Sequence, residues 1–128
     1  MVMLVRGIRG AITVVSDDKE LVIAATARLL KKMQQENQFR EGDIISVFLS
    51  ATPDIKSVFP AEARRLLQWD MVPLMCFQEI DVAGALPLCI RAMVHINSDK
   101  EQDEIKHIYL EEARSLRKDL IESPAILP

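Results

Sequence analysis

The residues of this chain with the most chemical potential are dispersed arginines together with a tyrosine, a glutamate and a cysteine. They are Arg9, Arg65, Arg91, Arg117, Tyr109, Glu79 and Cys76. A guanidinium binds a carboxylate through two parallel hydrogen bonds, so several converging arginines imply a rigidly held dicarboxylate ligand. Residue type alone therefore suggests a site for a small dianion.

Other familiar catalytic patterns are missing from the sequence. It has no GxSxG elbow, and neither His95 nor His107 accompanies a nucleophile or carboxylate in a familiar catalytic arrangement. The histidines also lack HExxH spacing and neighbouring Cys or Asp ligands, so we expect no metal site and treat both as structural or surface residues. Glu79 and Asp81 straddle a turn, which is a weak pattern for glycoside chemistry.

The stretch from Val72 to Arg91 reads as strand, turn, strand. Met71 to Phe77 is almost wholly apolar, and Leu88 to Ile96 is apolar and β-branched with Arg91 in its interior. Burying an unpaired guanidinium is very costly, so Arg91 must meet a carboxylate, with Glu79 the nearest, or face a cavity that receives an anion. The alternative is an arginine on the solvent face of an antiparallel strand, and this stretch alone leaves both open.

The segment that carries Arg9 is β-rich. Met3 to Val15 predicts a first strand, in which Gly7 and Gly10 suggest a bulge or a close backbone approach. Across a bulge, Arg6 and Arg9 project to different faces, so one of them reaches a pocket. The GIRG run lacks the GxGxxG spacing and a helix directly after it, which excludes a phosphate loop.

The remaining elements follow from periodicity and turn signals. Asp17 and Glu20 resemble a capping box that opens an amphipathic helix ending near Asn37. Ile44 to Ala51 predicts a second buried strand. Pro60 fits the first turn of a short helix that carries Arg65, for which the alternative is a plain surface arginine.

The segment around Tyr109 is ambiguous. Ile105, Ile108, Ala113 and Leu116 fit one face of a helix, whereas Ile108 and Leu110 flank the tyrosine in strand-like alternation. A lone tyrosine is also commonly a half-buried packing residue. We expect Leu116, Arg117 and the residues after them to form a mobile tail.

Length and composition limit the classes of function. With 128 residues, 49% of them hydrophobic and 27% charged, the chain has the composition of one folded domain. Its mean hydropathy of +0.10 leaves apolar surface that weakly favours a homo-oligomer. A net charge of −3 without a basic stripe argues against a nucleic-acid partner.

The same sequence argues against export and against membrane insertion. Arg6 and Arg9 interrupt any apolar signal core, and no run approaches transmembrane length, so we expect no membrane partner and a cytoplasmic protein. Cys76 and Cys89 are too few and too far apart for a zinc site or a CxxC pair. We interpret both as reduced thiols.

Six separate segments carry a more specific signal. They are RGIRGA at Arg6 to Ala11, SATPD at Ser50 to Asp54, VFPAEA at Val58 to Ala63, CFQEIDVAGALPLCIR at Cys76 to Arg91, HIYLEEA at His107 to Ala113 and LRKDL at Leu116 to Leu120. In content and order they resemble the small, monofunctional, trimeric chorismate mutases, which differ from the all-helical chorismate mutases. The resemblance spans nearly the whole chain.

This resemblance implies an α+β fold in which a five-stranded mixed sheet packs on helices. It implies a pseudo-barrel homotrimer with an active site in each intersubunit cleft, and it favours a short strand near Tyr109. The implied reaction is the Claisen rearrangement of chorismate to prephenate in phenylalanine and tyrosine biosynthesis, with no cofactor. We expect one domain over residues 1–120 and a flexible tail over residues 121–128.

The resemblance also implies roles for single residues. Arg91 directs its guanidinium at the ether oxygen, Arg9 holds the side-chain carboxylate, and Tyr109 hydrogen-bonds near that carboxylate. Glu79 and the region of Cys76 contact the ring hydroxyl and face the partial positive charge that develops on the ring. The wall of the site is predicted to be Phe59, Ala61, Leu74 and Met75. Its mouth is predicted to be Arg65, Leu116 and Arg117.

Several positions depart from the family pattern. Glu62 stands where relatives carry Lys, Met75 stands where a hydroxyl residue is common, and Lys118 replaces a proline. The chain is also one residue shorter between Arg65 and Trp69. The alternative function is a trimeric protein of similar architecture that binds or scavenges a small metabolite without performing the rearrangement.

Overall fold

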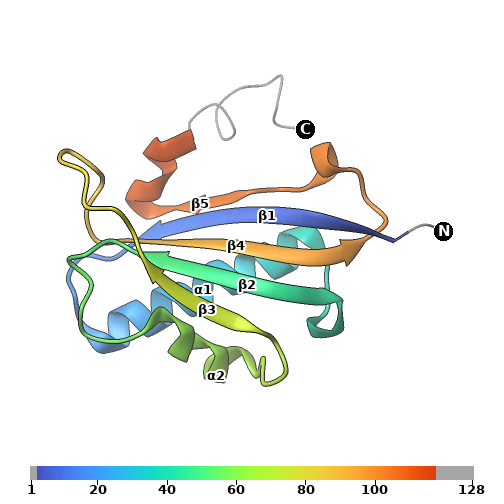
Figure 1. The fold of residues 1–128 in the computed structure, drawn as a ribbon, viewed down its shortest axis with the longest axis horizontal. Helices are drawn as coiled ribbons and strands as arrows, with labels where there is room; N and C mark the ends of the chain where they lie inside the picture. Colours follow the sequence, from blue (N-terminus) through green and yellow to red (C-terminus); the bar gives the residue numbers. More distant parts are fainter. Residues whose placement is uncertain (1–2, 118–128) are drawn as a thin grey trace.

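A computed structural model describes residues 3–117 of the chain, and these form one sheet with helices (Figure 1). The strands are β1 (Leu4–Thr13), β2 (Ile44–Ala51), β3 (Leu74–Gln78), β4 (Cys89–Ser98) and β5 (Ile108–Leu110). The α-helices are α1 (Lys19–Asn37) and α2 (Arg64–Leu67). Short 3-10 helices are η1 (Glu41–Asp43), η2 (Pro60–Ala63), η3 (Gln102–Glu104) and η4 (Glu111–Arg117).

The sheet is five-stranded and mixed, with the strand order β3-β2-β4-β1-β5. β4 lies antiparallel to both β1 and β2, whereas β3 runs parallel to β2 and β5 runs parallel to β1. The predicted α+β fold with a five-stranded mixed sheet on helices is therefore confirmed. β3 and β4 are joined by the loop that follows Gln78, yet β2 lies between them, so they are not a hairpin.

The two faces of the sheet differ in their cover. α1 passes behind the strands in Figure 1, and the apolar core lies between it and the sheet. Side chains alternate along each strand, so every second residue points to this core. The fully buried strand residues on that face include Ile8, Ile12, Val47, Leu49, Ile90 and Val94. The opposite face, which we call the open face, carries the intervening residues and is more exposed.

β1 is a regular strand, so the bulge, which is one of the two alternatives for its glycines, does not occur. Its register with β4 runs without a break from Leu4 opposite Ser98 to Thr13 opposite Cys89. The irregularity of the sheet lies in β2, where the register shifts between Ile44 and Ser46. Arg6 and Arg9 still project to opposite faces, because simple alternation separates positions three apart.

A close approach of α1, which was the other reading of the glycines, applies to Gly10. A Cβ atom there would lie 2.6 Å from Met33 Sδ and 3.1 Å from Leu29 Cδ1, both on α1. It would also lie 3.2 Å from the carbonyl oxygen of Ile108 on β5. The missing side chain therefore lets the helix and β5 pack closely beside Arg9.

The start of α1 differs from the predicted capping box by one residue. Asp18 is the N-cap, and its Oδ2 accepts a hydrogen bond from the Leu21 amide at 3.1 Å. Asp17 instead accepts hydrogen bonds from the amides of Lys56 and Ser57. Hydrogen bonds from Ser57 and Lys56 lower the pKa of the Asp17 carboxyl. Asp17 therefore connects the β1–α1 turn to the loop after β2.

The end of the described chain is more ordered than predicted for two residues. Leu116 and Arg117 belong to η4, so their assignment to a mobile tail is wrong. Ala113 in the same element is fully buried against Ala11 and Cys89, with Leu116 packed beside this small cluster. The expected domain boundary at residue 120 and the expected tail at residues 121–128 lie outside the described residues.

Candidate active site

Five of the predicted site residues meet in one cavity of about 320 Å³ on the open face. They are Arg9, Arg91, Tyr109, Leu116 and Arg117. They come from β1, β4, β5 and η4, and the register brings them together because Ala11 of β1 lies opposite Arg91 on one side and Tyr109 on the other. Phe48, Ser50, Phe77 and Met93 complete much of the wall.

The described residues that line this cavity carry charge of one sign. Three of its lining residues are arginines, and none of the described residues that line it is Asp or Glu. Within residues 3–117, no carboxylate lies within ion-pair distance of the Arg9 guanidinium, although Arg9 is partly buried. Guanidinium groups with apolar walls around them favour an anionic ligand that offers planar carboxylates.

Arg91 forms an ion pair with Glu79. Its Nε lies 3.0 Å from Glu79 Oε2, and the two side chains are 46% and 20% exposed. Both alternatives given for Arg91 therefore apply, because its side chain lies on the open face and also forms an ion pair with a carboxylate. Ser50 Oγ donates to the same Glu79 oxygen at 2.7 Å. Ser50 was not among the residues predicted for the site, although it lies in the SATPD segment.

The backbone around this pair is fixed from several directions. The Glu79 amide donates to the Ala51 carbonyl at 2.9 Å, which places Glu79 directly beyond the end of β2. Leu88, just before β4, has a φ of 51°, a conformation that costs a residue with a branched side chain roughly 1–3 kcal/mol. It is held by its amide donating to Asp54 Oδ2 at 2.9 Å and its carbonyl accepting from Val14 at 3.0 Å. The turn that leads into Arg91 is thus tightly anchored.

A second group of predicted residues lies around a different cavity of about 640 Å³. Phe59 and Cys76 line it, and Phe59 is 70% exposed. Leu74 and Ala61 pack against the main core, so this chain does not bring them to the open-face cavity. Met75 lies on the open face of β3 and is 57% exposed. The roles of all four wall residues stay predictions.

Cys76 is a neutral thiol in this setting. Burial raises the pKa of the Cys76 thiol, and it raises the pKa of Cys89 to about 11. Neither sulfur is therefore a thiolate near neutral pH. A contact of Cys76 with a ring hydroxyl would be a weak, uncharged hydrogen bond, which leaves Glu79 as the source of negative charge.

Arg65 lies at neither cavity. Its Nη2 is 3.3 Å from Glu62 Oε1, three residues earlier, and its side chain is 68% exposed. The glutamate that departs from the family pattern thus neutralises the arginine predicted at the mouth. Whether Arg65 contacts substrate stays a prediction.

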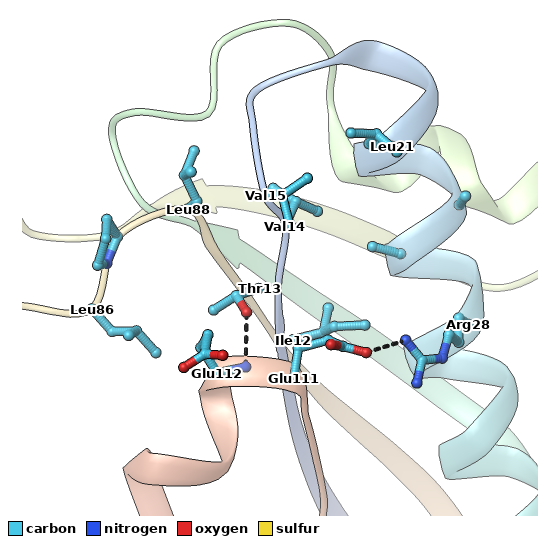
Figure 2. Close-up of a pocket in the computed structure, with 13 residues that line it drawn as sticks. Ile12, Thr13, Val14, Val15, Leu21, Arg28, Leu86, Leu88, Glu111 and Glu112 are labelled. Atoms are coloured by element: carbon cyan, nitrogen blue, oxygen red, sulfur yellow. Dashed lines mark hydrogen bonds and ion pairs between the residues drawn. The ribbon is translucent and has the colours of Figure 1, made fainter.

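A third cavity, of about 470 Å³, lies between β1, α1 and η4 (Figure 2). Its walls are mainly apolar side chains such as Ile12, Val14 and Leu21, with the ion pair between Arg28 and Glu111 at 2.7 Å along its side. No described residue predicted for the site lines it. With a single, already paired arginine, it does not fit a dianion.

Two further findings concern residues 3–117. They contain no group of three or more His, Cys, Asp or Glu side chains placed to hold a metal ion. They also contain no helix with the length and hydropathy needed to cross a bilayer.

Comparison with known proteins identifies the family of this chain. A family model described as "Chorismate mutase type I" matches residues 5–120. The chain belongs to the type I chorismate mutases. It is 48% identical over 119 residues to "Chorismate mutase AroH" of Bacillus subtilis (strain 168), covering 92% of this chain and 94% of the relative.

Two further similar proteins are also named chorismate mutases. "Chorismate mutase AroH" of Thermus thermophilus is 44% identical over 118 residues, covering 91% of this chain and 97% of the relative. A solved structure of a chorismate mutase from Clostridium thermocellum superposes with a TM-score of 0.84 at 45% identity. That match covers 85% of this chain and 97% of the solved one.

Proposed function

We propose that this chain catalyses the rearrangement of chorismate to prephenate, a step toward phenylalanine and tyrosine. The observation that carries the assignment to a site is the open-face cavity, where Arg9, Arg91 and Tyr109 converge. Chorismate is a dicarboxylate, and this cavity offers three arginines without an acidic residue among the described lining. Membership of the type I chorismate mutase family supports the same reaction.

The reaction is intramolecular and pericyclic, so it requires neither proton transfer nor a covalent intermediate. One carbon–oxygen bond breaks while one carbon–carbon bond forms, and no atom enters or leaves. Negative charge grows on the ether oxygen and positive charge grows on the ring. Catalysis therefore consists of holding the reactive conformer and of stabilising separated charge in a preorganised site.

Arg91 is the group we assign to the ether oxygen. Glu79 engages its Nε, and a guanidinium has four further N–H donors that can face a ligand. The ion pair fixes the guanidinium plane before substrate arrives, which is the preorganisation that electrostatic catalysis needs. The Glu79 carboxylate lies beside it as the counterpart for positive charge on the ring.

Arg9 and Tyr109 are assigned to the side-chain carboxylate of the substrate. They lie on neighbouring strands of the same cavity, and Arg117 of η4 adds a cation at its border. Clamping this carboxylate restricts the flexible side chain to its folded, reactive form. Leu116 and Arg117 are assigned to the mouth, together with Arg65.

A homotrimer with intersubunit sites forms part of the proposal. Within one chain, Phe59 and Cys76 lie around a different cavity from Arg9 and Tyr109, so a cleft between subunits is one way to unite both groups. Apolar side chains exposed on the open face support burial against another subunit, as Met75 is 57% and Phe77 48% exposed. Light scattering tests the trimer, and a fully active monomer would contradict it.

The activity is tested by mixing purified protein with chorismate and following loss of the ring diene in the ultraviolet, with prephenate identified as product. We expect turnover far above the uncatalysed rate. The matched control is Arg91→Ala, which removes the guanidinium from the cavity. A protein that binds chorismate without converting it would establish the metabolite-binding alternative instead.

A further inference from the structure

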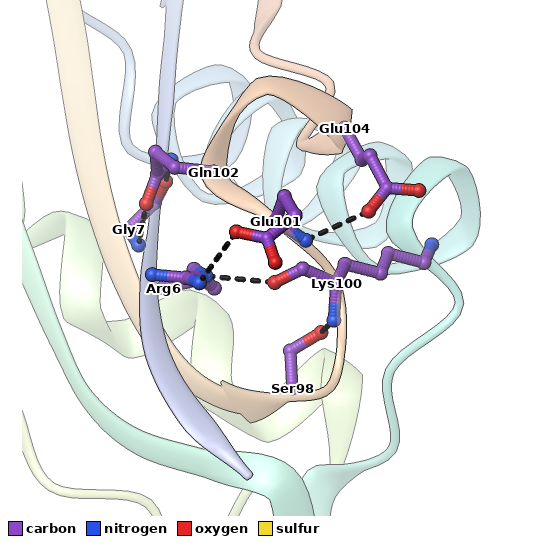
Figure 3. A network of polar contacts seen from close by, with 7 residues as sticks. All are labelled: Arg6, Gly7, Ser98, Lys100, Glu101, Gln102 and Glu104. Carbon is purple, nitrogen blue, oxygen red and sulfur yellow. Dashed lines mark hydrogen bonds and ion pairs between the residues drawn. The ribbon is translucent and has the colours of Figure 1, made fainter. Parts of the chain in front are cut away.

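The outer edge of β1 is only partly covered by a strand. β5 pairs with Gly10, Ala11 and Ile12, which are three of the ten residues of β1. Side chains meet the edge before that point. The Gln102 amide pairs with Gly7 in both directions, at 3.2 Å from the Gly7 nitrogen and 2.8 Å from its oxygen (Figure 3). Gln102 thus acts as a short substitute for a strand.

Between Gln102 and β5, the side chain of His107 contacts the same edge of β1. Its Nδ1 accepts a hydrogen bond from the Arg9 backbone amide at 2.9 Å. Arg9 is one of the residues that line the open-face cavity. The imidazole therefore holds the backbone at the point from which that guanidinium projects.

The position of His107 is itself fixed from the end of α1. The buried side chain of Asn37 accepts from the Lys106 amide at 2.8 Å and donates to the Lys106 carbonyl at 2.9 Å. The same Asn37 nitrogen reaches the Met33 carbonyl at 3.0 Å. Lys106 immediately precedes His107, so a rigid path leads from α1 through Asn37 and His107 to the Arg9 amide.

We propose that His107 is a positioning residue, which fixes Arg9 for substrate binding by accepting the hydrogen bond from its backbone amide. The proposal rests on the substrate-binding role proposed for Arg9. Only a neutral imidazole with its proton on Nε2 accepts at Nδ1, whereas protonated His107 would place a donor against the Arg9 donor. The hydrogen bond from the Arg9 amide to His107 Nδ1, which we call the clamp, therefore exists in only one protonation state of His107.

The surroundings of His107 favour that state. The pKa of His107 is lowered below its ordinary value of 6.5, mainly by burial of the ring. The positive charges of Arg9 on β1 and Arg117 on η4 lower it further. At neutral pH the imidazole is thus an acceptor. Acidification below this lowered pKa protonates His107, which removes the hydrogen bond and adds a third cation beside the two arginines.

Two substitutions separate an acceptor role from simple packing. His107→Asn keeps an acceptor oxygen near the place of Nδ1 but cannot titrate, whereas His107→Leu removes the acceptor. We expect His107→Leu to raise KM for chorismate by about five- to tenfold with a smaller change in kcat, and His107→Asn to stay within about threefold of the parent. A His107→Leu variant within about twofold of the parent KM would overturn the proposal.

The pH profile gives a second readout. The parent kcat/KM should fall in one protonation step below the ordinary histidine pKa, and His107→Asn should lack that step. An acid limb that persists in His107→Asn would also overturn the proposal. Gln102→Ala is the matched control, because it removes the neighbouring side-chain pairing with β1 and should lower thermal stability while leaving KM unchanged.

Failure of the proposed function and failure of this inference are distinguishable by NMR without substrate. In 15N-labelled parent protein, the Arg9 amide resonance should shift with the titration of the His107 ring, and this coupling should vanish in His107→Asn. An Arg9 amide that ignores the titration refutes the clamp even in an active enzyme. A coupled amide in a protein without mutase activity supports the clamp and refutes the reaction.

Discussion

Arg91 Nε and Glu79 Oε2 lie 3.0 Å apart on the open face of the sheet. Glu79 directly follows β3 and Arg91 lies on β4, and these two strands are separated by β2. Ser50 on the intervening strand lies opposite Arg91 and donates to the same Glu79 oxygen. A cation, an anion and a hydroxyl from three adjoining parts of the sheet thus form one small network. Arg91 and Ser50 line the cavity assigned to substrate, and Glu79 contacts both of them from outside its described lining.

Arg91→Lys should be severe. Lysine keeps the charge but loses the planar fork that reaches Glu79 and the ether oxygen together. A fixed donor aimed at developing charge is commonly worth about 3 to 4 kcal/mol, so kcat should fall by about 10² to 10³ with the fold intact. Steady-state kinetics and circular dichroism measure the two. If the variant kept turnover within about threefold, the assignment of Arg91 would be wrong.

Ser50→Ala should reduce catalysis without unfolding the protein. The hydroxyl holds Glu79 Oε2 at 2.7 Å, and a hydrogen bond to a charged group contributes about 1.5 to 3 kcal/mol. Freed of it, Glu79 adopts more orientations, and we expect kcat/KM to fall by roughly tenfold or more.

Ser46→Ala is the matched control for Ser50→Ala. Ser46 lies on the same face of β2 and its hydroxyl contacts His95 Nδ1 at 3.2 Å, outside the described lining of the open-face cavity. We expect its kinetics to match the parent. Equal losses in both variants would show that the effect of Ser50 is general to the strand and not specific to Glu79.

Glu62→Gln should leave the positive charge of Arg65 unneutralised at the predicted mouth of the site. The pair is exposed, so its loss should change the free energy of unfolding by less than about 1 kcal/mol. The added positive field should lower KM for the dianionic substrate at low ionic strength, with kcat unchanged, and salt should suppress the effect. Asp70→Asn is the control, because it breaks the exposed pair of 3.8 Å between Arg64, the neighbour of Arg65 on α2, and Asp70, which lies beyond the end of that helix. A KM that ignores Glu62→Gln would contradict a position of Arg65 at the mouth.

The strands were predictable because their residue types decide them locally. The apolar run at Ile44 to Ala51 is a strand with the same bounds in the structure, and the run that contains Arg91 is β4. Periodicity alone left the segment near Tyr109 open between helix and strand. The three-residue β5 there forms by pairing with β1, a long-range contact that no local pattern contains.

The candidate site was predictable in its charges and not in its supports. Arginines in apolar runs stand out by type, so Arg9 and Arg91 were found. Ser50 and His107 form hydrogen bonds with partners 29 and 98 residues away along the chain, and a serine or histidine carries no local sign of such a partner. The N-cap was misplaced by one residue because Asp17 and Asp18 are chemically equal there, and only the tertiary contacts of Asp17 with Lys56 and Ser57 separate them.

The two thiols should react slowly and unequally. Since burial raises both pKa values, the thiolate fraction is small near neutral pH and grows only as pH rises through them. Cys76, which is partly exposed, should be alkylated by iodoacetamide more slowly than a free cysteine, and the fully buried Cys89 should react only after unfolding. Mass spectrometry of labelled peptides across pH measures this. Fast labelling of Cys76 at neutral pH would contradict its description as a neutral thiol.

Gly10→Ala should destabilise the protein through the contact between β1, α1 and β5. The new methyl group would lie 2.6 Å from Met33 Sδ and 3.2 Å from the backbone oxygen of Ile108, so either α1 or β5 must move. Overpacking of this kind typically costs about 1 to 3 kcal/mol, to be measured as the free energy of unfolding in urea. Gly42→Ala is the control, because a Cβ there meets no atom within 4 Å and the backbone is not left-handed, so stability should not fall. A displaced β5 would also shift Tyr109 and Ile108, which directly follows His107. We therefore expect a raised KM for chorismate in Gly10→Ala. If Gly10→Ala were as stable as Gly42→Ala, the close packing of α1 on β1 would be refuted.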